Sequence, residues 1–456
     1  MKKLFLTLVL GVAAFGAYAQ LADNDARYNQ YGTRVNRMSL QPEARDGILV
    51  FESQNQTFRF WFDIRVQIDG AFFFGEKEFM DPIGNGISIR RARFAVKSQI
   101  NENWYGEIDM DLSDGEFELK DALIRYSTCN WEFSLGNFKE DFSMEQTTSS
   151  RYLPMMERPM AVQAFAPSRH LGLDAKFRKN WFYMSAGAFF QTIDNLETST
   201  NVKDNNKDFG RSQGVSFTGK VVFNPWYKDA WRGLHIGGGA SYRTPKTDVA
   251  KGDYPSIRYD VRNSTAINRK KYTDTDNIKD VDKMFLWNGE FAAHYRGLRL
   301  QGEYIGNNVI MLNKAADNRT KVFGGWYAMA GVVLFGGEQR YNMGDAKFTQ
   351  PTRGRWWGDI ELIARYDYID LNSKDIYGGA GQNFTFGLNY YFNENVKFVL
   401  NYQYSWNDRY ANGRGDYKVG YTAEGNPTSD YKLVDAAKGK AGIRYNMIGM
   451  RMEIDF

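Results

Sequence analysis

The chain has 456 residues, of which 58 are lysine or arginine and 54 aspartate or glutamate, so its formal net charge is only +4. No block of basic residues accompanies that small charge, which argues against a nucleic-acid partner. The single cysteine, Cys129, excludes an internal disulfide framework and a cysteine-based zinc cluster. Aromatic residues reach 16% although the mean hydropathy is -0.54, which suits a barrel with an apolar outside, a wet inside and aromatic belts.

The N-terminus has the pattern of a secretory signal peptide. Two lysines precede an apolar run over 4–14, and Ala17-Tyr18-Ala19 forms a small-residue cleavage site. No later stretch approaches the roughly 20 apolar residues that a membrane-spanning helix needs. We therefore expect a signal peptide at 1–19 that directs export.

Alternation of apolar and polar residues is the main structural signal. From Phe58 to Ile68 the even positions are all apolar, whereas most of the odd positions from Arg59 to Asp69 are charged or polar. Ordinary strands have about 5–6 residues, whereas a tilted membrane strand needs about 9–11. Charges on one face and aromatic residues on the other fit a strand between water and lipid.

The pattern recurs to the end of the chain and predicts an all-β fold, a transmembrane antiparallel β-barrel of about 16 strands. We expect this outer-membrane barrel at 57–456, after a periplasmic lead-in at 20–56. The expected strands are 57–74, 86–100, 104–113, 117–128, 131–139, 170–179, 181–191, 214–223, 233–244, 284–296, 298–307, 321–335, 356–370, 382–392, 396–407 and 439–456. Short turns alternate with long polar loops, as expected for periplasmic and outer connections. The connection at 336–355 breaks this rhythm, because it is long but falls on the short-turn side. Either this connection contains a hairpin that the pattern does not reveal, or it is an extended turn.

The last strand ends on an aromatic residue, Phe456. A final amphipathic strand with a terminal aromatic is expected to act as the signal for the barrel-assembly machinery. The apolar positions change parity near Ile448, which predicts a β-bulge there.

Alternation also assigns charged side chains to the lumen. The expected lumen-facing cations of the first two strands are Arg59, Arg65, Arg91, Arg93 and Lys97, and an acidic wall opposite them consists of Glu107, Asp109 and Asp111. Opposed walls of this kind fit a general porin as well as an anion channel.

Several segments resemble the phosphate-selective porin O and P family. They are Arg90-Arg91-Ala92-Arg93, Glu118-Leu119-Lys120-Asp121-Ala122, LGNFKEDFSMEQTTSSR at 135–151, Met156-Glu157-Arg158, AFAPSRHLGL at 164–173 and ELIARYDYIDL at 361–371. The resemblance implies a homotrimer of 16-stranded barrels, a preference for phosphate, and a loop after the fifth strand that folds into the lumen. Our independent strand count puts residues 140–169 in that place. That loop carries Arg151, Arg158 and Arg169, which either form the constriction or pair with wall charges and pin the loop.

We expect a porin that passes small solutes, among them anions such as phosphate, and that contacts outer-membrane lipid and lipopolysaccharide. The three histidines belong to no Ser-His-Asp order or metal-spaced cluster, so we expect no enzyme, metal or cofactor. Two other classes stay open. One is a non-conducting barrel that acts as a receptor, adhesin or secretion component, and the other is a secreted soluble β-enzyme.

Deleting Phe456 tests the assembly signal. We expect the deletion to lower the yield of assembled barrel while export continues, which fractionation and heat-modifiable gel mobility would measure. A normal yield of barrel would remove the argument from the terminal aromatic.

Overall fold

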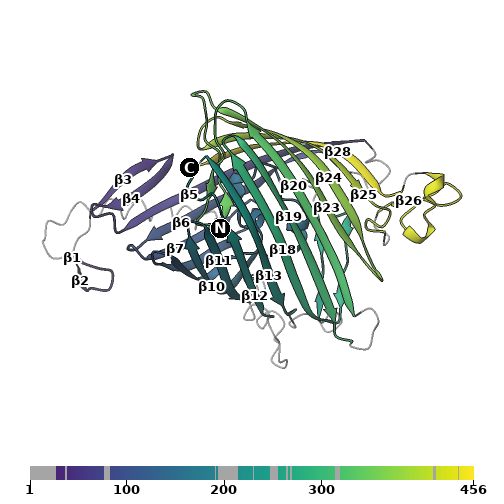
Figure 1. Ribbon diagram of the computed structural model, residues 1–456, viewed down its shortest axis with the longest axis horizontal. Coiled ribbons are helices and arrows are strands. Elements are labelled where there is room, and N and C mark those ends of the chain that lie inside the picture. Colours follow the sequence, from purple (N-terminus) through teal and green to yellow (C-terminus); the bar gives the residue numbers. More distant parts are fainter. Residues whose placement is uncertain are drawn as a thin grey trace.

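The computed structural model describes residues 27–35, 39–75, 83–113, 115–190, 192–193, 214–229, 231–246, 255–262, 265–267, 270–313, 319–413, 417–439 and 441–456. Sixteen strands in this part of the chain form a closed antiparallel barrel (Figure 1), which confirms the predicted fold class. Their bounds are β5 (Arg59–Phe74), β6 (Gly86–Gln99), β7 (Trp104–Asp111), β8 (Glu118–Ser127), β9 (Trp131–Lys139), β10 (Arg169–Lys179), β11 (Phe182–Phe189), β12 (Ser216–Phe223), β13 (Arg232–Arg243), β18 (Val281–Tyr295), β19 (Leu298–Met311), β20 (Thr320–Val333), β23 (Asp359–Ser373), β24 (Ile376–Tyr391), β25 (Val396–Asn407) and β28 (Ile443–Asp455).

The shorter elements are not counted among the sixteen strands. They are β1 (Arg27–Tyr28), β2 (Arg34–Val35), β3 (Leu40–Arg45), β4 (Ile48–Ser53), α2 (Met144–Thr147), η2 (Ser150–Tyr152), α3 (Met160–Phe165), β14 (Ser256–Ile257), β15 (Asp260–Val261), β16 (Thr273–Asp274), β17 (Ile278–Lys279), β21 (Tyr341–Asn342), β22 (Lys347–Phe348), β26 (Gly420–Tyr421), β27 (Pro427–Thr428), η4 (Tyr431–Leu433) and η5 (Ala436–Lys438). Within the described ranges, no helix has both the length and the apolar character needed to cross a membrane.

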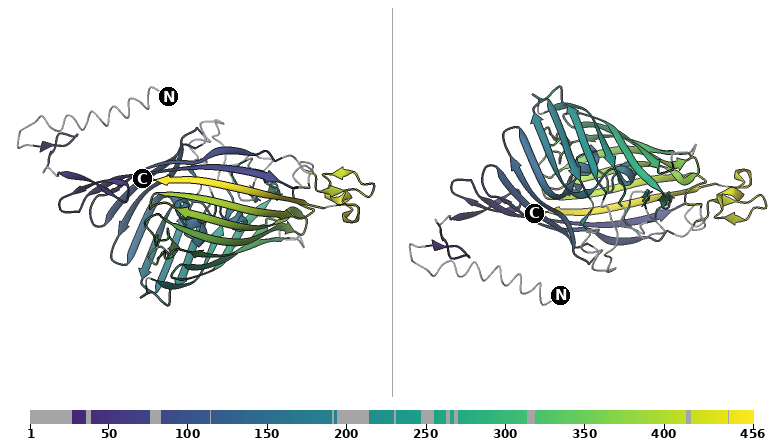
Figure 2. Two further views of the ribbon diagram at one scale, coloured as in Figure 1. Left: turned by 90° about the horizontal axis from the view of Figure 1, so that it is seen from above. Right: turned by 90° about the horizontal axis from the view of Figure 1, so that it is seen from below.

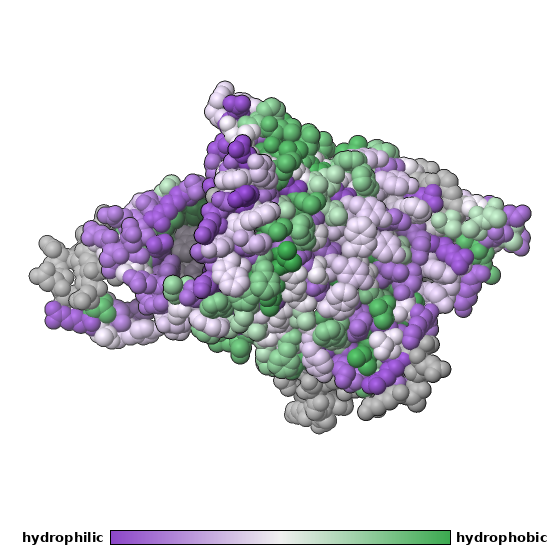
Figure 3. Space-filling model, in the orientation of Figure 1, coloured by the Kyte–Doolittle hydropathy of each residue, from purple (hydrophilic) through white to green (hydrophobic). Residues whose placement is uncertain are grey.

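The alternation becomes two faces of the wall. On β25, Tyr402 and Trp406 are exposed on the outside while Gln403 and Ser405 between them are buried inside. In Figure 3 apolar residues gather on the barrel wall, and the end at the left is hollowed. An apolar outside and a polar inside are what a barrel in lipid requires.

The two ends of the barrel differ. β26 and β27 lie at the long-loop end, and the β3–β4 hairpin and the C-terminus lie at the short-turn end (Figures 1 and 2). The connection from β20 to β23 is at the short-turn end and contains the β21–β22 hairpin, so the long turn is extended and does hold a missed hairpin.

Closure brings the two ends of the chain together. β28 pairs with β5 from Asp455↔Arg65 to Asn446↔Phe74. Where β28 ends, Phe456 exchanges two backbone hydrogen bonds with Ile64. β4 then pairs with the part of the same β5 edge that β28 leaves open, with Val50 opposite Trp61. The hairpin thus continues the wall beyond the end of β28.

The predicted bulge near Ile448 is wrong. β28 keeps continuous register with β25 from Ile443 to Ile454. The parity changes because Ile443, Tyr445 and Met447 face inward and pack in a buried cluster with Phe73 and Tyr272. The lumen face of β28 is therefore apolar towards the long-loop end.

A charge on the outside of β24 tests the assignment of faces. Phe386 lies mid-strand with 49% of its surface exposed, so Phe386→Arg places a cation in lipid at a cost of about 2–4 kcal/mol. We expect much less heat-modifiable barrel from this variant and a normal yield from Phe386→Leu. Equal yields would mean that β24 does not face lipid.

Candidate functional site

Residues 140–169, called the inserted loop here, fill part of the lumen. Its helical segments appear in blue between the walls in Figure 2. Phe142, Met160 and Phe165 belong to a buried apolar cluster with inward-facing side chains of β18, β19, β20 and β23, among them Met284, Ile305, Phe323 and Ile363. A lumen face in contact with water is polar, so these apolar residues mark where the wall carries protein instead. The β18–β23 side of the lumen is therefore filled.

Two wall carboxylates hold the start of α2. The backbone N–H groups of Met144 and Glu145 donate to Glu290 Oε2 and Glu303 Oε1, both at 2.8 Å. Ser143 caps the helix by accepting from the N–H of Gln146. Carboxylates near a helix N-terminus are stabilising because they meet unpaired N–H groups. The sequence therefore anchors the loop with acids on β18 and β19.

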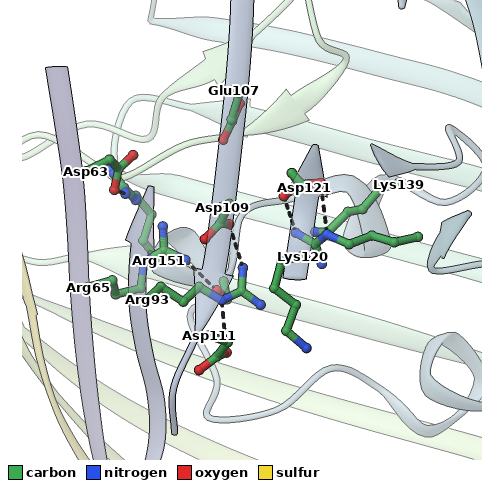
Figure 4. A network of polar contacts seen from close by, with 12 residues as sticks. Asp63, Arg65, Arg93, Glu107, Asp109, Asp111, Lys120, Asp121, Lys139 and Arg151 are labelled. Atoms are coloured by element: carbon green, nitrogen blue, oxygen red, sulfur yellow. Dashed lines mark hydrogen bonds and ion pairs between the residues drawn. The ribbon is translucent and has the colours of Figure 1, made fainter. Parts of the chain in front are cut away.

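Ion pairs anchor the opposite side of the loop. Arg151 pairs with Asp63 of β5 (Figure 4) and lies 3.8 Å from Asp455. Arg65 bridges Asp455 at 3.1 Å and Ser150 Oγ at 2.7 Å. These contacts join the loop, the first barrel strand and the last one.

The remaining predicted loop arginines are also engaged. Arg169 forms a bidentate pair with Asp121, at 2.9 and 2.6 Å. Arg158 donates to the backbone carbonyls of Glu145, Gln146 and Thr148. These contacts show how the loop is pinned, and a role in constriction stays a prediction.

A cavity of about 250 Å³ remains between the inserted loop, the β5–β11 wall and the β21–β22 hairpin. Eight cationic side chains and six carboxylates are among the residues that line it. They are Arg65, Arg93, Lys97, Arg125, Lys139, Arg169, Lys176 and Lys347, and Asp63, Glu107, Asp109, Asp121, Asp141 and Asp345. In the described part of the chain, this charged side of the lumen faces the filled apolar side.

The predicted basic and acidic walls meet each other. Arg93 Nε lies 3.2 Å from Asp111 and its Nη1 lies 3.5 Å from Asp109 (Figure 4). Lys97 lies 2.5 Å from Asp63 and 3.6 Å from Glu107. The opposed charges on β6 and β7 therefore neutralise one another in part.

Two predicted lumen cations lie outside the lining of this cavity. Arg59 pairs with Glu52 of the β3–β4 hairpin at 2.6 Å. Arg91 is buried and donates to Gln67 Oε1 at 2.6 Å.

Sequence reasoning missed Arg90. The register of β6 against β5 shifts between Gln67↔Arg91 and Ile68↔Ile89, so Arg90 is an extra residue in a bulge. Arg90 pairs with Glu157 of the inserted loop. Strict alternation would put Arg90 on the outer face. Because an arginine in lipid is destabilising, that placement could have indicated that the alternation is interrupted here. Asp345 and Lys347 were missed because the hairpin that carries them was not recognised.

Three carboxylates come close together on the acidic side. One oxygen each from Glu107, Asp109 and Asp121 lies within 4.8 Å of the others, a spacing that suits a metal ion. Each carboxylate also contacts a cation of the protein, namely Lys97, Arg93 and Arg169 respectively. The residues therefore balance these charges internally.

Glu140 is the buried anchor at the start of the inserted loop. It accepts from Arg243 at 2.8 and 2.9 Å and lies 2.8 Å from His170 Nδ1. Burial opposes its ionisation, but Arg243 and His170 outweigh burial and lower its pKa to about 2.

Replacing this anchor tests its contribution. Glu140→Gln leaves Arg243 without its carboxylate, and breaking a buried pair costs about 3–5 kcal/mol. We expect a lower temperature of heat modification, with Glu394→Gln on an exposed turn as the control. Because the folded pKa is depressed, the stabilisation is complete above the ordinary value of 4.5 and disappears as pH falls through about 2. A temperature of heat modification in the wild type that had already fallen to that of Glu140→Gln at pH 6 would contradict this prediction.

Comparison with known proteins identifies the family. The family model described as phosphate-selective porin O and P matches residues 60–424. Porin O of Pseudomonas aeruginosa is 25% identical over 409 residues, covering 81% of this chain and 88% of that protein. A protein of uncharacterised function from Caulobacter vibrioides is 28% identical over 402 residues, covering 86% of this chain and 73% of its own.

The fold agrees with this match. An anion-selective porin from Comamonas acidovorans has a TM-score of 0.50 at 11% identity, covering 88% of this chain and all of that one. Family and fold together indicate an outer-membrane channel rather than an enzyme. The resemblance seen in the sequence is confirmed, and the chain belongs to the phosphate-selective porin O and P family.

Proposed function

We propose that this porin forms a water-filled passage for small solutes with a mild preference for anions such as phosphate. The observation that carries the proposal is the cavity beside the inserted loop, where eight cations face six carboxylates. Charges in a narrow site with low-dielectric walls act more strongly than in bulk water. A small excess of cations is therefore enough to favour anions.

The arrangement of partners supports preference over strict selectivity. Lys139 lines the cavity and donates from Nζ to the backbone carbonyls of Gln146 and Thr148, at 2.8 and 3.3 Å. Arg93 and Lys97, in contrast, contact carboxylates. Lysine and arginine side chains that already pair with carboxylates attract a passing anion less and repel a passing cation less. We therefore expect the channel to disfavour solute cations without excluding them.

We further propose that the chain is exported by a cleaved signal at 1–19, inserted by the barrel-assembly machinery and assembled as a homotrimer among outer-membrane lipid and lipopolysaccharide. The family membership supports this course, as does the apolar outer wall.

One observation favours the alternative of a non-conducting barrel with a receptor, adhesin or secretion role. The buried apolar cluster fills part of the lumen and includes Val261 and Ile278 from the connection between β13 and β18. Protein in that region narrows any passage towards the long-loop end. Single-channel recording separates the alternatives, because only a porin gives discrete conductance steps.

Reversal potential in a salt gradient across a planar bilayer tests the selectivity. We expect a modest anion preference for the wild type, a lower one for Arg93→Ala/Lys97→Ala, and a higher one for Asp109→Asn. Lys438→Ala, on the exposed η5 turn, is the control and should match the wild type. Phosphate is then added to measure block of the chloride current. Phosphate would be removed from the proposal if the wild type proved cation-selective. The same would follow if the lumen variants had the reversal potential of the wild type.

A further inference from the structure

A groove crosses the outer face of the barrel wall. It has a volume of about 710 Å³ and extends over the adjacent strands β19, β20, β23, β24, β25 and β28, from Leu298 to Ile448 (Figure 1). Neighbouring strands lie about 4.8 Å apart, so the spacings between these strands make the groove about 24 Å long. Among its lining residues, Leu298, Leu362, Phe386, Tyr402 and Ile448 expose between 38% and 54% of their surface. The groove is therefore apolar and opens outward.

Two alanines form the floor of this groove. Ala330 on β20 lies directly opposite Ala364 on β23. Larger side chains lie around them, because Val332 faces Leu362 one position closer to the short turns on the same side, and Phe386 lies opposite Ala364 on the next strand. Small residues between larger ones leave a depression, and its volume and apolar lining are typical of ligand sites.

Outward aromatic residues place the groove in the bilayer. Trp326 lies opposite Tyr368, nearer the long loops than the floor of the groove. At the short-turn end, Trp357 stacks on Tyr390 with ring centroids 6.3 Å apart. Aromatic residues at both ends mark the two interfaces of a wall that faces lipid. One end of the groove is at Leu298, the first residue of β19 after its short turn, and the other lies midway along β28. The groove thus rises from the periplasmic interface towards the middle of the bilayer.

Two turns meet at the periplasmic end of the groove. Asp359, the first residue of β23, accepts hydrogen bonds from the N–H groups of Gly337 and Gly354, at 2.9 and 2.8 Å. The N–H of Gln339 donates to the carbonyl of Arg296 at 2.8 Å. These bonds hold the turn that carries Arg296 beside the chain at Gly354, at the short-turn ends of β20 and β23.

Each of these turns carries an exposed arginine, Arg296 in one and Arg355 in the other. In the part of the chain that the structure describes, neither arginine forms an ion pair with a carboxylate, whereas the neighbouring Arg353 pairs with Glu394. Trp356, next to Arg355, exposes 91% of its surface. Guanidinium groups bind phosphate through charge-assisted hydrogen bonds, and tryptophan is enriched at the level of lipid headgroups. The periplasmic end of the groove therefore suits the headgroup of an anionic lipid.

We infer that the groove binds one anionic phospholipid of the periplasmic leaflet. An acyl chain lies over the floor of the groove, and the phosphate lies at the periplasmic end, where Arg296 and Arg355 supply the opposite charge. An acyl chain spans half of a hydrocarbon core about 30 Å thick, so a groove about 24 Å long holds a whole chain. Basic side chains beside an apolar site favour anionic over zwitterionic headgroups. This inference does not depend on solute passage or selectivity.

Native mass spectrometry of the full-length porin, with phosphatidylglycerol or phosphatidylethanolamine added, tests the headgroup. We expect the wild type to bind phosphatidylglycerol more tightly. Arg296→Gln/Arg355→Gln should weaken that binding about 30-fold, which corresponds to about 1 kcal/mol for each arginine near the membrane surface. Binding of phosphatidylethanolamine should change much less. Arg353→Gln, which removes a paired arginine of the same connection, is the matched control and should bind both lipids as the wild type does.

Filling the groove tests the acyl-chain site. Ala330→Leu/Ala364→Leu raises the floor with side chains that lipid tolerates, so we expect an assembled barrel that binds both lipids more weakly. Ala240→Leu, an outward position of β13 away from the groove, is the control. Phosphatidylglycerol with a photoreactive group in its acyl chain should form adducts on β20, β23 and β24 of the wild type and lose them in the filled variant. Heat-modifiable gel mobility verifies that each variant is assembled.

The remaining outcomes count against the inference. Equal binding of the two lipids, or an unchanged affinity of the arginine variant, would remove the anionic headgroup. Adducts spread evenly around the barrel would mean that the groove binds no lipid in particular, and an acylated protein held there would replace the phospholipid by another partner. Conductance of the same variants is recorded in parallel, so a conducting channel without preference for phosphatidylglycerol overturns the lipid site but leaves the proposed function intact.

Discussion

Packing of the inserted loop against the inner face of β18–β23 is the contact on which the rest of the lumen depends. A barrel of this size encloses more space than its own inward side chains fill. Phe142, Met160 and Phe165 supply an apolar surface, and the facing strands supply residues such as Ile305 and Phe323 to cover it. Burying that surface on one side leaves the charged side chains of β5–β10 to line the cavity that remains.

The charges are arranged by the same packing. With its apolar side fixed, the loop presents Arg151 to Asp63 and Glu157 to Arg90. These partners lie 88 and 67 positions apart in the sequence and meet because the loop folds into the lumen. Paired charges of this kind position the loop more than they attract solute, because each cation already has a carboxylate beside it. Lys139, in contrast, contacts backbone carbonyls of the loop.

The wall could be predicted from the sequence, and its contents could not. Alternation over a whole membrane strand is a local pattern, so all sixteen strands were recognised, most with bounds within four residues, although β24 begins six residues before the expected 382. The lumen depends on long-range contacts that no local period reports. The inward apolar residues Tyr445 and Met447 were interpreted as a bulge. Arg90 was assigned to the outer face because the bulge in β6 was not predicted. The β21–β22 hairpin was missed because each of its strands has only two residues. The charged residues of β6 and β7 were placed inside, but their pairing with one another follows from register alone.

The junction of Ile64 with Phe456 also bears on the order in which contacts form during folding. The first and last barrel strands are joined by contacts such as Arg65 with Asp455, which are 390 positions apart. Closing so long a chain is the entropically most demanding and slowest kind of contact to form. Until β28 pairs with β5, the sheet is an open ribbon. During that interval the inserted loop has no enclosed space to occupy, and sealing the cylinder and fixing its contents become one cooperative step.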